Sequence, residues 1–273
     1  MEKNVKNIYL HIMDMHDQKL FIFNQERIAQ YSEADYIVKF WASAFETFFG
    51  TDEHLFIHWG DTQSSPCKRN NLKISLDMRF MIMKNSKYIM DGANCEYARK
   101  AIPGKFFKDK LKLILASIAY INDIIINCPY LEEDDYLNIK IPLVQIMGFE
   151  GSLSIMRLKD KGVYVVEEIA KLRFPTTKKQ LREGGIKELV KVLSLLKHLL
   201  DNLQEIMEEE KFNHKDSKMT GISNESRPPQ RNSAFKDWVT EIVVPPNSGD
   251  DEEEDEEYED EEKEDEEEEE SKV

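Results

Sequence analysis

The chain has 273 residues and a formal net charge of −16, from 53 acidic and 37 basic side chains. Nineteen of the acids lie between Asp250 and Glu270, and the remainder without residues 250–273 has 34 acids and 35 bases. The body of the protein is therefore close to neutral, and it lacks the basic excess that is typical of a nucleic-acid-binding domain.

Composition also argues against several other classes of protein. No apolar stretch reaches the roughly 20 residues that a membrane-spanning helix needs, so we expect no membrane partner. The polar start of the chain does not resemble a signal peptide. Three widely spaced cysteines, Cys67, Cys95 and Cys128, fit neither a disulfide framework nor a CxxC zinc site. We therefore expect an intracellular protein, nuclear or cytoplasmic.

Hydrophobic periodicity predicts the elements of the first half of the chain. Apolar residues alternate in part of Ile8–Phe23, which fits a pair of short strands or an irregular lead-in. Spacings of three and four residues predict a helix over Ser32–Phe49, with Ser32 as its N-cap. Asp61–Asn71 is rich in turn-forming residues and is expected to be a loop. Three strands are predicted at His54–Trp59, Leu72–Met83 and Tyr88–Ala98, the last broken at Asp91–Gly92.

The second half repeats this pattern. A long helix is predicted over Lys105–Asn127, followed by strands at Ile141–Met147, Leu153–Leu158 and Val163–Ile169 and a last helix over Ile186–Glu210. The fold class is therefore α/β (α+β), a single mixed-sheet domain flanked by helices in the order α-βββ-α-βββ-α, and it occupies residues 1–212.

Beyond this domain the composition changes twice. Residues 213–249 read as a flexible linker that contains an apolar island at 235–244. The island either docks on the domain or binds a partner, and docking is favoured because it buries the patch within one chain. Residues 250–273 are expected to be a disordered acidic tail, because like charges at this density repel one another.

Leucines of the last helix recur at alternating spacings of four and three residues, which is the heptad pattern of a coiled coil. We expect this apolar stripe to pack against the sheet, with dimerisation as the alternative; the sequence leaves the oligomeric state open. The stripe consists of Leu189, Leu193, Leu196, Leu200, Leu203 and Met207.

Two carboxylates give the chain its main candidate for catalysis. Asp77 lies in the second predicted strand and Glu96 in the third, so that both can converge on one divalent cation such as Mg²⁺. A bound Mg²⁺ would activate water and stabilise negative charge on a phosphate. Glu33, at the start of the first helix, is a possible third metal ligand.

The order of these residues resembles the PD-(D/E)XK, or restriction-endonuclease-like, fold. The stretches SEADYIVKFWASAFE, IHWGDT, CEYARK, KDKLKLILAS, IPLVQIMGFEGS and YVVEEIAKLRFPTT also resemble a large family of proteins of unassigned function from early-diverging (mucoromycete) fungi. The resemblance covers roughly Ser32 to Leu200. It implies a metal-dependent phosphodiester hydrolase with Asp77 and Glu96 as its catalytic and metal-binding acids.

The chain departs from the family motif at two positions. Leu76 precedes Asp77 where the motif has proline, and Ala98 stands where the motif has lysine. The resemblance therefore implies a degenerate site unless Arg99 or Lys100 replaces the missing cation from a shifted position. Lys100 shares a face with Glu96 only if the strand continues past Ala98.

Two further interpretations compete with a nuclease. Asp77 and Glu96 would be ordinary surface ion pairs if their partners were Arg79 and Lys100. The protein would be a non-enzymatic interaction module if its acidic tail binds basic proteins such as histones. Lys105, Lys108 and Lys112 mark a candidate nucleic-acid surface. The acidic tail either competes with nucleic acid for this surface, binds basic proteins, or only keeps the protein soluble, which is the role we favour.

Overall fold

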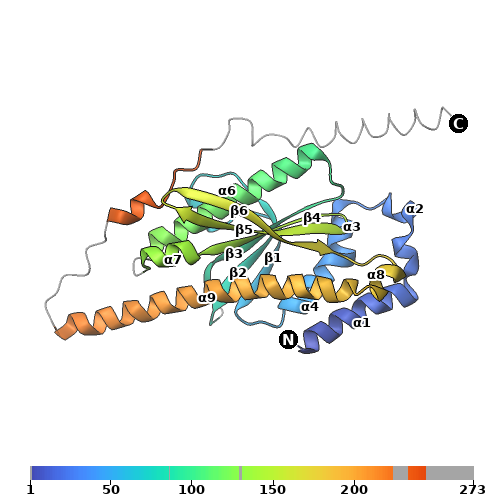
Figure 1. The fold of residues 1–273 in the computed structure, drawn as a ribbon, viewed down its shortest axis with the longest axis horizontal. Helices are drawn as coiled ribbons and strands as arrows, with labels where there is room; N and C mark the ends of the chain where they lie inside the picture. Colours follow the sequence, from blue (N-terminus) through green and yellow to red (C-terminus); the bar gives the residue numbers. More distant parts are fainter. Residues whose placement is uncertain (1, 86, 129–130, 224–232, 244–273) are drawn as a thin grey trace.

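The computed structural model describes residues 2–85, 87–128, 131–223 and 233–243. It confirms the predicted class, a six-stranded mixed sheet flanked by helices, with the strands side by side in chain order (Figure 1). The strands are β1 (Leu55–Thr62), β2 (Leu76–Lys84), β3 (Lys87–Ala98), β4 (Lys140–Met147), β5 (Glu150–Asp160) and β6 (Val163–Arg173).

One parallel pair interrupts an otherwise antiparallel sheet. β3 and β4 run parallel, whereas all other neighbouring strands are antiparallel. Parallel neighbours need a crossover connection, and here the long helix α6 (Pro103–Asn127) and the short α7 (Glu133–Asn138) supply it. The crossover returns the chain over one face of the sheet, so α6 starts just after the end of β3.

The remaining helices complete two layers around the sheet. Figure 1 shows α6 on one face and α1, α4 and α9 on the other. Their bounds are α1 (Glu2–Gln18), α2 (Gln25–Ile28), α3 (Glu33–Tyr36), α4 (Ala42–Phe49), α5 (Ser65–Arg69), α8 (Lys178–Arg182) and α9 (Gly185–Ser223). A π-helical turn, Ile37–Trp41, joins α3 to α4, so the predicted helix over Ser32–Phe49 forms as one continuous unit after the Ser32 cap.

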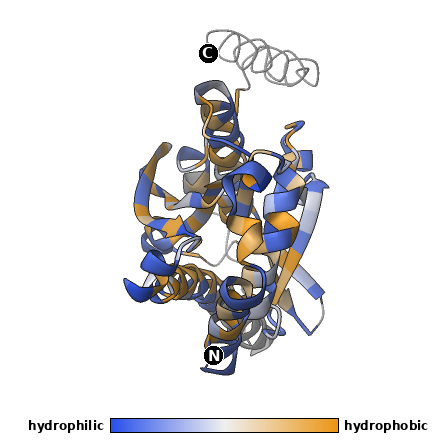
Figure 2. Ribbon diagram, turned by 90° about the vertical axis from the view of Figure 1, so that its right-hand side faces the viewer, coloured by the Kyte–Doolittle hydropathy of each residue, from blue (hydrophilic) through white to orange (hydrophobic). Residues whose placement is uncertain are grey.

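The two faces of the sheet differ in chemistry. Side chains alternate between the faces along a strand, and the face toward α4 and α9 is apolar: Phe80, for example, contacts Phe45 and Phe49. In Figure 2 hydrophobic and hydrophilic residues alternate along the helices, as expected of helices that bury one side. The face under α6 instead buries polar side chains, namely Arg79, Asn94, Glu96, Gln145, Ser152 and Ser154.

The strands predicted within Ile8–Phe23 are wrong, because this segment forms α1 and a 3₁₀ turn at Leu20–Phe23. Ile8, Ile12 and Met15 are buried at spacings of four and three residues, which is a helical stripe. Leu10, which completed the apparent alternation, is 57% exposed. Ile8 and Ile12 therefore lie on the buried side of one helix and Leu10 on its exposed side, so their alternation in the sequence does not indicate a strand.

Two smaller departures concern the loop and the third strand. The expected loop at Asp61–Asn71 contains α5, whose N-cap Ser64 accepts a hydrogen bond from the Cys67 amide. β3 is not broken at Asp91–Gly92. Shifts in the β2–β3 register absorb the irregularity, and the strand continues to Ala98.

The last helix extends beyond its predicted end. Residues 213–223, assigned above to the linker, belong to α9. All six residues of its heptad stripe are buried within this chain, and a methyl group on Gly92 of β3 would lie only 2.9 Å from Leu200 Cδ2. Packing of the stripe against the sheet is therefore confirmed.

The apolar island docks on the domain, as predicted, with Trp238 as its buried residue. Trp238 is 4% exposed and packs against the ring of Tyr136 in α7, with ring centroids 5.5 Å apart. The carbonyl of Thr240 accepts a hydrogen bond of 2.9 Å from Asn122 in α6. The predicted acidic tail, residues 250–273, lies outside the described residues. Within the described part of the chain, none of the helices has the length and apolar character to cross a membrane.

Candidate active site

Asp77 and Glu96 lie opposite one another on neighbouring strands. Met78 pairs with Cys95, and the same register extended by one residue places Asp77 opposite Glu96. Directly opposed residues on antiparallel strands have Cβ atoms about 4.5–5.5 Å apart. Asp77 Oδ2 accepts a hydrogen bond of 2.6 Å from the Tyr97 amide, which fixes this carboxylate against β3. The structure therefore brings the two predicted acids together on the face under α6.

Glu96 is buried, and one of its oxygens has no hydrogen-bond partner. Its side chain is 1% exposed, and Oε2 lies 3.6 Å from Lys112 Nζ in α6. Oε1 is buried without a donor. Burial, reinforced by the nearby Asp77, raises the pKa of Glu96 well above its usual value, although Lys112 opposes the shift. A buried acceptor without a donor costs free energy, so Oε1 is suited to receive a cation or a proton.

Asp109 brings a third carboxylate to this layer from α6. It is fully buried, neither of its oxygens has a hydrogen-bond donor, and Lys105 Nζ lies 3.7 Å from Oδ1. Burial raises the pKa of Asp109 to about 6, against the opposing effects of Lys105 and Lys112. Asp109 was not among the residues predicted for this site. The sequence pattern that could have identified Asp109 is its position on the predicted helix, four residues after Lys105 and three residues before Lys112.

Glu33 stands at the edge of the same cluster. It occupies the first turn of α3, behind the Ser32–Asp35 capping box, and its Oε2 lies 3.9 Å from Lys105 Nζ. Burial and then the charge of Asp77 raise the pKa of Glu33 to about 7. Because its side chain is 37% exposed, it faces both the cluster and the solvent.

The lysines of α6 divide between two sides of the helix. Lys105, Lys108 and Lys112 follow one flank at spacings of three and four residues, and the first and last of them approach the carboxylates. Lys110 does not belong to this flank. Its Nζ instead donates a hydrogen bond of 2.9 Å to Ser154 Oγ in β5. The three lysines predicted to contact nucleic acid thus lie along one flank of α6, beside the acids.

The substitutes proposed for the missing lysine have other surroundings. Arg99 Nη2 donates a hydrogen bond of 2.7 Å to the carbonyl of Ala29. β3 ends at Ala98, so the condition under which Lys100 would share the face of Glu96 is not met. The catalytic role of both residues stays a prediction. The cation that the structure places beside Glu96 is Lys112.

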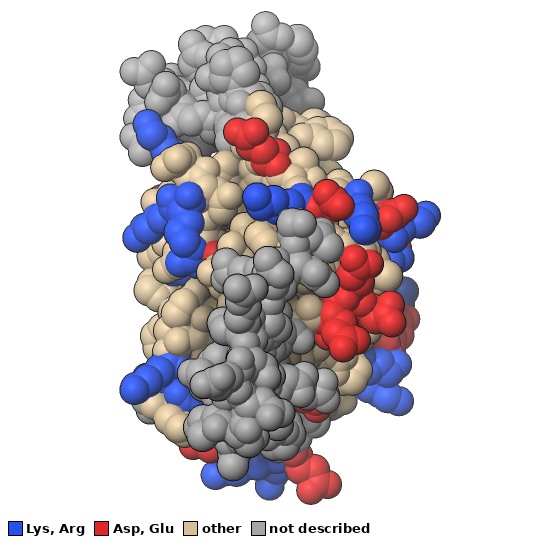
Figure 3. Space-filling view, turned by 90° about the vertical axis from the view of Figure 1, so that its left-hand side faces the viewer, with Lys and Arg blue, Asp and Glu red and all other residues tan. Residues whose placement is uncertain are grey.

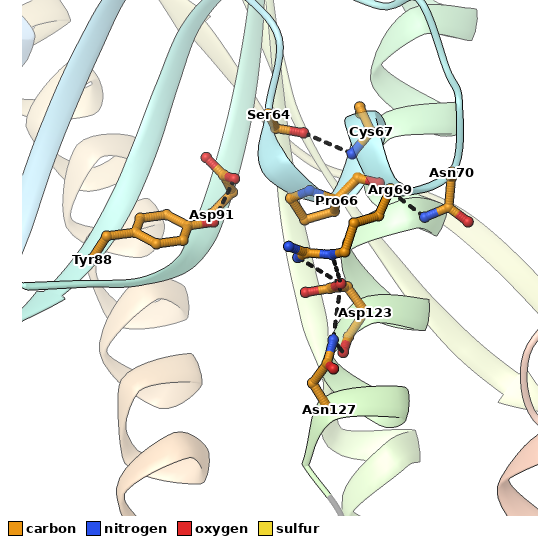
Figure 4. A network of polar contacts seen from close by, with 9 residues as sticks. All are labelled: Ser64, Pro66, Cys67, Arg69, Asn70, Tyr88, Asp91, Asp123 and Asn127. Atoms are coloured by element: carbon orange, nitrogen blue, oxygen red, sulfur yellow. Dashed lines mark hydrogen bonds and ion pairs between the residues drawn. The ribbon is translucent and has the colours of Figure 1, made fainter.

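The interpretation of the two acids as surface ion pairs is wrong for Glu96, which is buried. Arg79 pairs with Asp91 in a second buried cluster. Tyr88 OH donates a hydrogen bond of 2.8 Å to the other oxygen of Asp91, as Figure 4 shows. This pair stabilises the sheet farther along α6 and does not contact Asp77 in any described interaction.

The same view shows how α5 is fastened to α6 (Figure 4). Arg69 Nη2 lies 2.6 Å from Asp123 Oδ1, and Asn127 donates a hydrogen bond of 3.0 Å to the same oxygen. These contacts hold the C-terminal end of α6 against the β1–β2 connection. They help to fix the rotation of the helix, on which the position of Lys112 depends.

Asp77 and Glu96 are the residues of this cluster that could hold a small divalent cation. Among the described residues, no three His, Cys, Asp or Glu side chains form a group able to hold a metal ion. Mg²⁺, however, is usually held by one or two carboxylates together with water and substrate phosphate. Asp77 and Glu96 provide two such carboxylates, and Glu96 Oε1 has no competing donor. The remaining positions would be open to substrate and water.

Comparison with known proteins adds no assignment: no family model, no curated protein and no solved structure matches this chain. Fold and site geometry are therefore the grounds for a functional proposal.

Proposed function

We propose that this protein is a metal-dependent phosphodiester hydrolase of the restriction-endonuclease-like type that acts on nucleic acid. One observation carries the proposal. The carboxylate of Glu96 lies opposite Asp77 and 3.6 Å from the ammonium of Lys112, so two acids and one cation meet under the start of α6. With Lys112 beside Glu96, the absence of lysine at position 98 does not imply a degenerate site.

Asp77 and Glu96 would hold Mg²⁺, which supplies an activated water and a positive charge beside the scissile phosphate. The chain's own residues would orient these groups. Tyr97 fixes the carboxylate of Asp77 through its amide, and the strand pairing fixes Glu96. Lys112 would stabilise the charge that develops on the phosphate, because a positioned cation in a partly buried site acts more strongly than in water.

The substrate class follows from the flank of α6. Lys105, Lys108 and Lys112 present three cations along one side of the helix, and lysine contacts phosphates without reading the base sequence. On the face drawn in Figure 3, acidic and basic side chains are interspersed. We therefore propose that binding depends on a local flank and not on a broad basic surface.

Cleavage assays with the full-length chain test the proposal. Labelled single- and double-stranded DNA and RNA would be incubated with Mg²⁺ or Mn²⁺, or with EDTA. We expect cleavage that requires the metal ion and falls about 10²–10³-fold in Lys112→Met, the scale reported for losing one charge-stabilising group. Glu96→Gln and Asp77→Asn should abolish it.

The matched control is Lys191→Met, which removes a lysine from an exposed pair with Glu188 on α9 and should leave cleavage unchanged. Circular dichroism would verify that each variant is folded. Full activity in Lys112→Met or Glu96→Gln would refute the site, and the absence of cleavage from every substrate would refute the hydrolase.

The second candidate is a non-enzymatic binding protein. It is favoured by the 19 acids between Asp250 and Glu270, which we propose would engage basic proteins such as histones. Histone binding should then be lost on deletion of residues 250–273 and be unaffected by Glu96→Gln. Equal binding by the full-length and shortened chains would remove this candidate.

A further inference from the structure

Gln145 is a buried polar residue in the same row of side chains as Asp77 and Glu96. In the parallel pairing of β3 and β4, Gln145 is the partner of Glu96, and it is 3% exposed. The row therefore crosses three strands under α6, from Asp77 on β2 through Glu96 to Gln145. None of the functions discussed so far requires an amide at this position.

The orientation of the Gln145 amide is set by its hydrogen bonding. Nε2 donates a bond of 2.8 Å to the carbonyl of Phe106 in the first turn of α6. If the amide were flipped, Gln145 Oε1 would face the carbonyl oxygen of Phe106, and two acceptors cannot form a hydrogen bond. The orientation with Nε2 toward this carbonyl is therefore the correct one. Oε1 is consequently directed away from that carbonyl, and it is buried without a donor.

Three neighbouring groups thus share the same deficit. Glu96 Oε1, Gln145 Oε1 and both oxygens of Asp109 are buried acceptors without hydrogen-bond donors. Each such group costs about 1–3 kcal/mol unless something satisfies it. A divalent cation bound by Asp77 and Glu96 would lie in this layer. Among the described residues, no third His, Cys, Asp or Glu joins these two acids in a group able to hold a metal ion, although Asp109 lies in the same layer.

We propose that Gln145 Oε1 is a further ligand of the cation held by Asp77 and Glu96. The inference rests on the proposed function, which it deepens by adding a neutral oxygen ligand from β4. Amide oxygens are suitable ligands for hard cations. The hydrogen bond to Phe106 already holds the Gln145 side chain in one orientation. Binding of the cation would therefore not have to order this side chain.

Asn94 is the closest rival for this role, because its Oδ1 is also buried without a donor. It lies two residues before Glu96 on β3 and opposite Arg79, so a cationic side chain already stands beside it. Gln145 has Glu96 beside it instead. The position in the row of acids therefore favours Gln145.

Mn²⁺ binding, followed by electron paramagnetic resonance on the full-length chain without substrate, tests the inference. The acidic tail will also bind Mn²⁺, so the site is defined as the component of binding that Asp77→Asn removes. We expect Gln145→Met, which keeps the length but has no oxygen, to weaken this component about 10-fold or more. Gln145→Glu, which keeps an oxygen, should retain it.

The matched control is Ser152→Ala, which changes the next residue of the row on β5, opposite Gln145 and farther from Glu96. It should bind Mn²⁺ like the unmodified protein. Thermal unfolding would establish that the Gln145→Met chain is folded at the assay temperature.

Each outcome has one meaning. Unchanged binding in Gln145→Met overturns the inference and leaves the proposed hydrolase intact. Equal losses in Gln145→Met and Gln145→Glu also overturn it, because the lost contact would then be the amide donor to Phe106. If no component of binding depends on Asp77, both the inference and the metal-dependent function fail.

Discussion

At the scale of single residues, the cluster under α6 keeps acids where burial opposes their charge. Asp109 is fully buried and Glu96 is 1% exposed, yet the described hydrogen bonds provide no donor for several of their oxygens. An interior selected for stability alone would not contain such groups. Unfavourable burial of ionisable side chains in one place is typical of a functional site.

Burial of Asp109 should make the stability of the protein depend on pH. The folded-state pKa of Asp109 is raised from 3.8 to about 6, so its contribution to stability is complete below about pH 4 and is lost as the pH rises through about 6. Asp109→Asn, which cannot ionise, should be more stable than the unmodified protein at pH 8 by about 1–3 kcal/mol and similar to it near pH 4. Urea unfolding at both pH values measures this difference.

The control for that experiment is Asp134→Asn, which changes an exposed acid on α7. It should produce the same small effect at both pH values. A free energy of unfolding that is lower for Asp109→Asn than for the unmodified chain at pH 8 would contradict the prediction. It would mean that the attraction of Lys105 and Lys112 outweighs the cost of burial.

At this scale the sequence predicted the acids but not their cation. Asp77 and Glu96 could be placed together because neighbouring antiparallel strands bring opposite residues together. Lys112 could not be assigned, since its contact with Glu96 depends on how α6 is rotated over the sheet. That rotation is fixed by contacts such as Arg69–Asp123, between residues 54 positions apart.

At the scale of elements, α9 and β3 approach so closely that a side chain would not fit between them. A Cβ atom on Gly92 would lie 2.9 Å from Leu200 Cδ2 and 3.0 Å from Ile82 Cγ1. These distances are shorter than ordinary van der Waals contact. Glycine at this position lets the leucine stripe of α9 pack directly on the strand.

We therefore predict that Gly92→Ala lowers the free energy of unfolding by about 1–3 kcal/mol, the range for overpacking a core. Leu200→Ala alone should cost about 2–5 kcal/mol. The double variant should cost less than the sum of the two, because removal of the Leu200 methyl groups makes space for the new one. Chemical denaturation of the four proteins measures the coupling.

Leu193→Ala provides the comparison, since Leu193 is buried on the same helix but is not among the near neighbours of Gly92. Its effect should add to that of Gly92→Ala. Additive costs for Leu200→Ala and Gly92→Ala would show that the two residues are not in contact in solution.

At the scale of the whole molecule, the docked island fastens a distant part of the chain to the domain. Trp238 packs against the ring of Tyr136 in α7, and its carbonyl accepts a hydrogen bond from Tyr164 in β6. The ammonium of Lys161 lies 5.6 Å from the centroid of the Trp238 ring. The island contacts the C-terminal half of α6 through Asn122. It therefore docks away from the first turns of α6, where the candidate site lies.

Trp238→Ala should accordingly lower the free energy of unfolding by about 3–5 kcal/mol, the range for removing a large buried aromatic side chain. It should also make residues 233–243 more accessible to protease in the folded protein. Denaturation and limited proteolysis with mass spectrometry test both effects. Val243→Ala is the control, because Val243 belongs to the same segment but is 79% exposed; equal protease resistance in both variants would contradict docking through Trp238.

The sequence by itself determined the local features of this protein. The periodicity of apolar residues specified most helices and strands and their order. The spacing that lets a helix or strand bury one face is visible within a short stretch of sequence. The charge count separated a near-neutral body from the acidic stretch at 250–270. The same rule failed at Ile8–Phe23, where a helical stripe and a short alternation share Ile8 and Ile12.

Only the tertiary structure decided which distant residues meet. It placed Lys112 beside Glu96, buried Asp109, oriented the amide of Gln145, and docked Trp238. These contacts depend on the rotation of a helix about its axis, the register between strands and the path of a connection. Each of these is set by packing over the whole domain, so no short stretch of sequence encodes it.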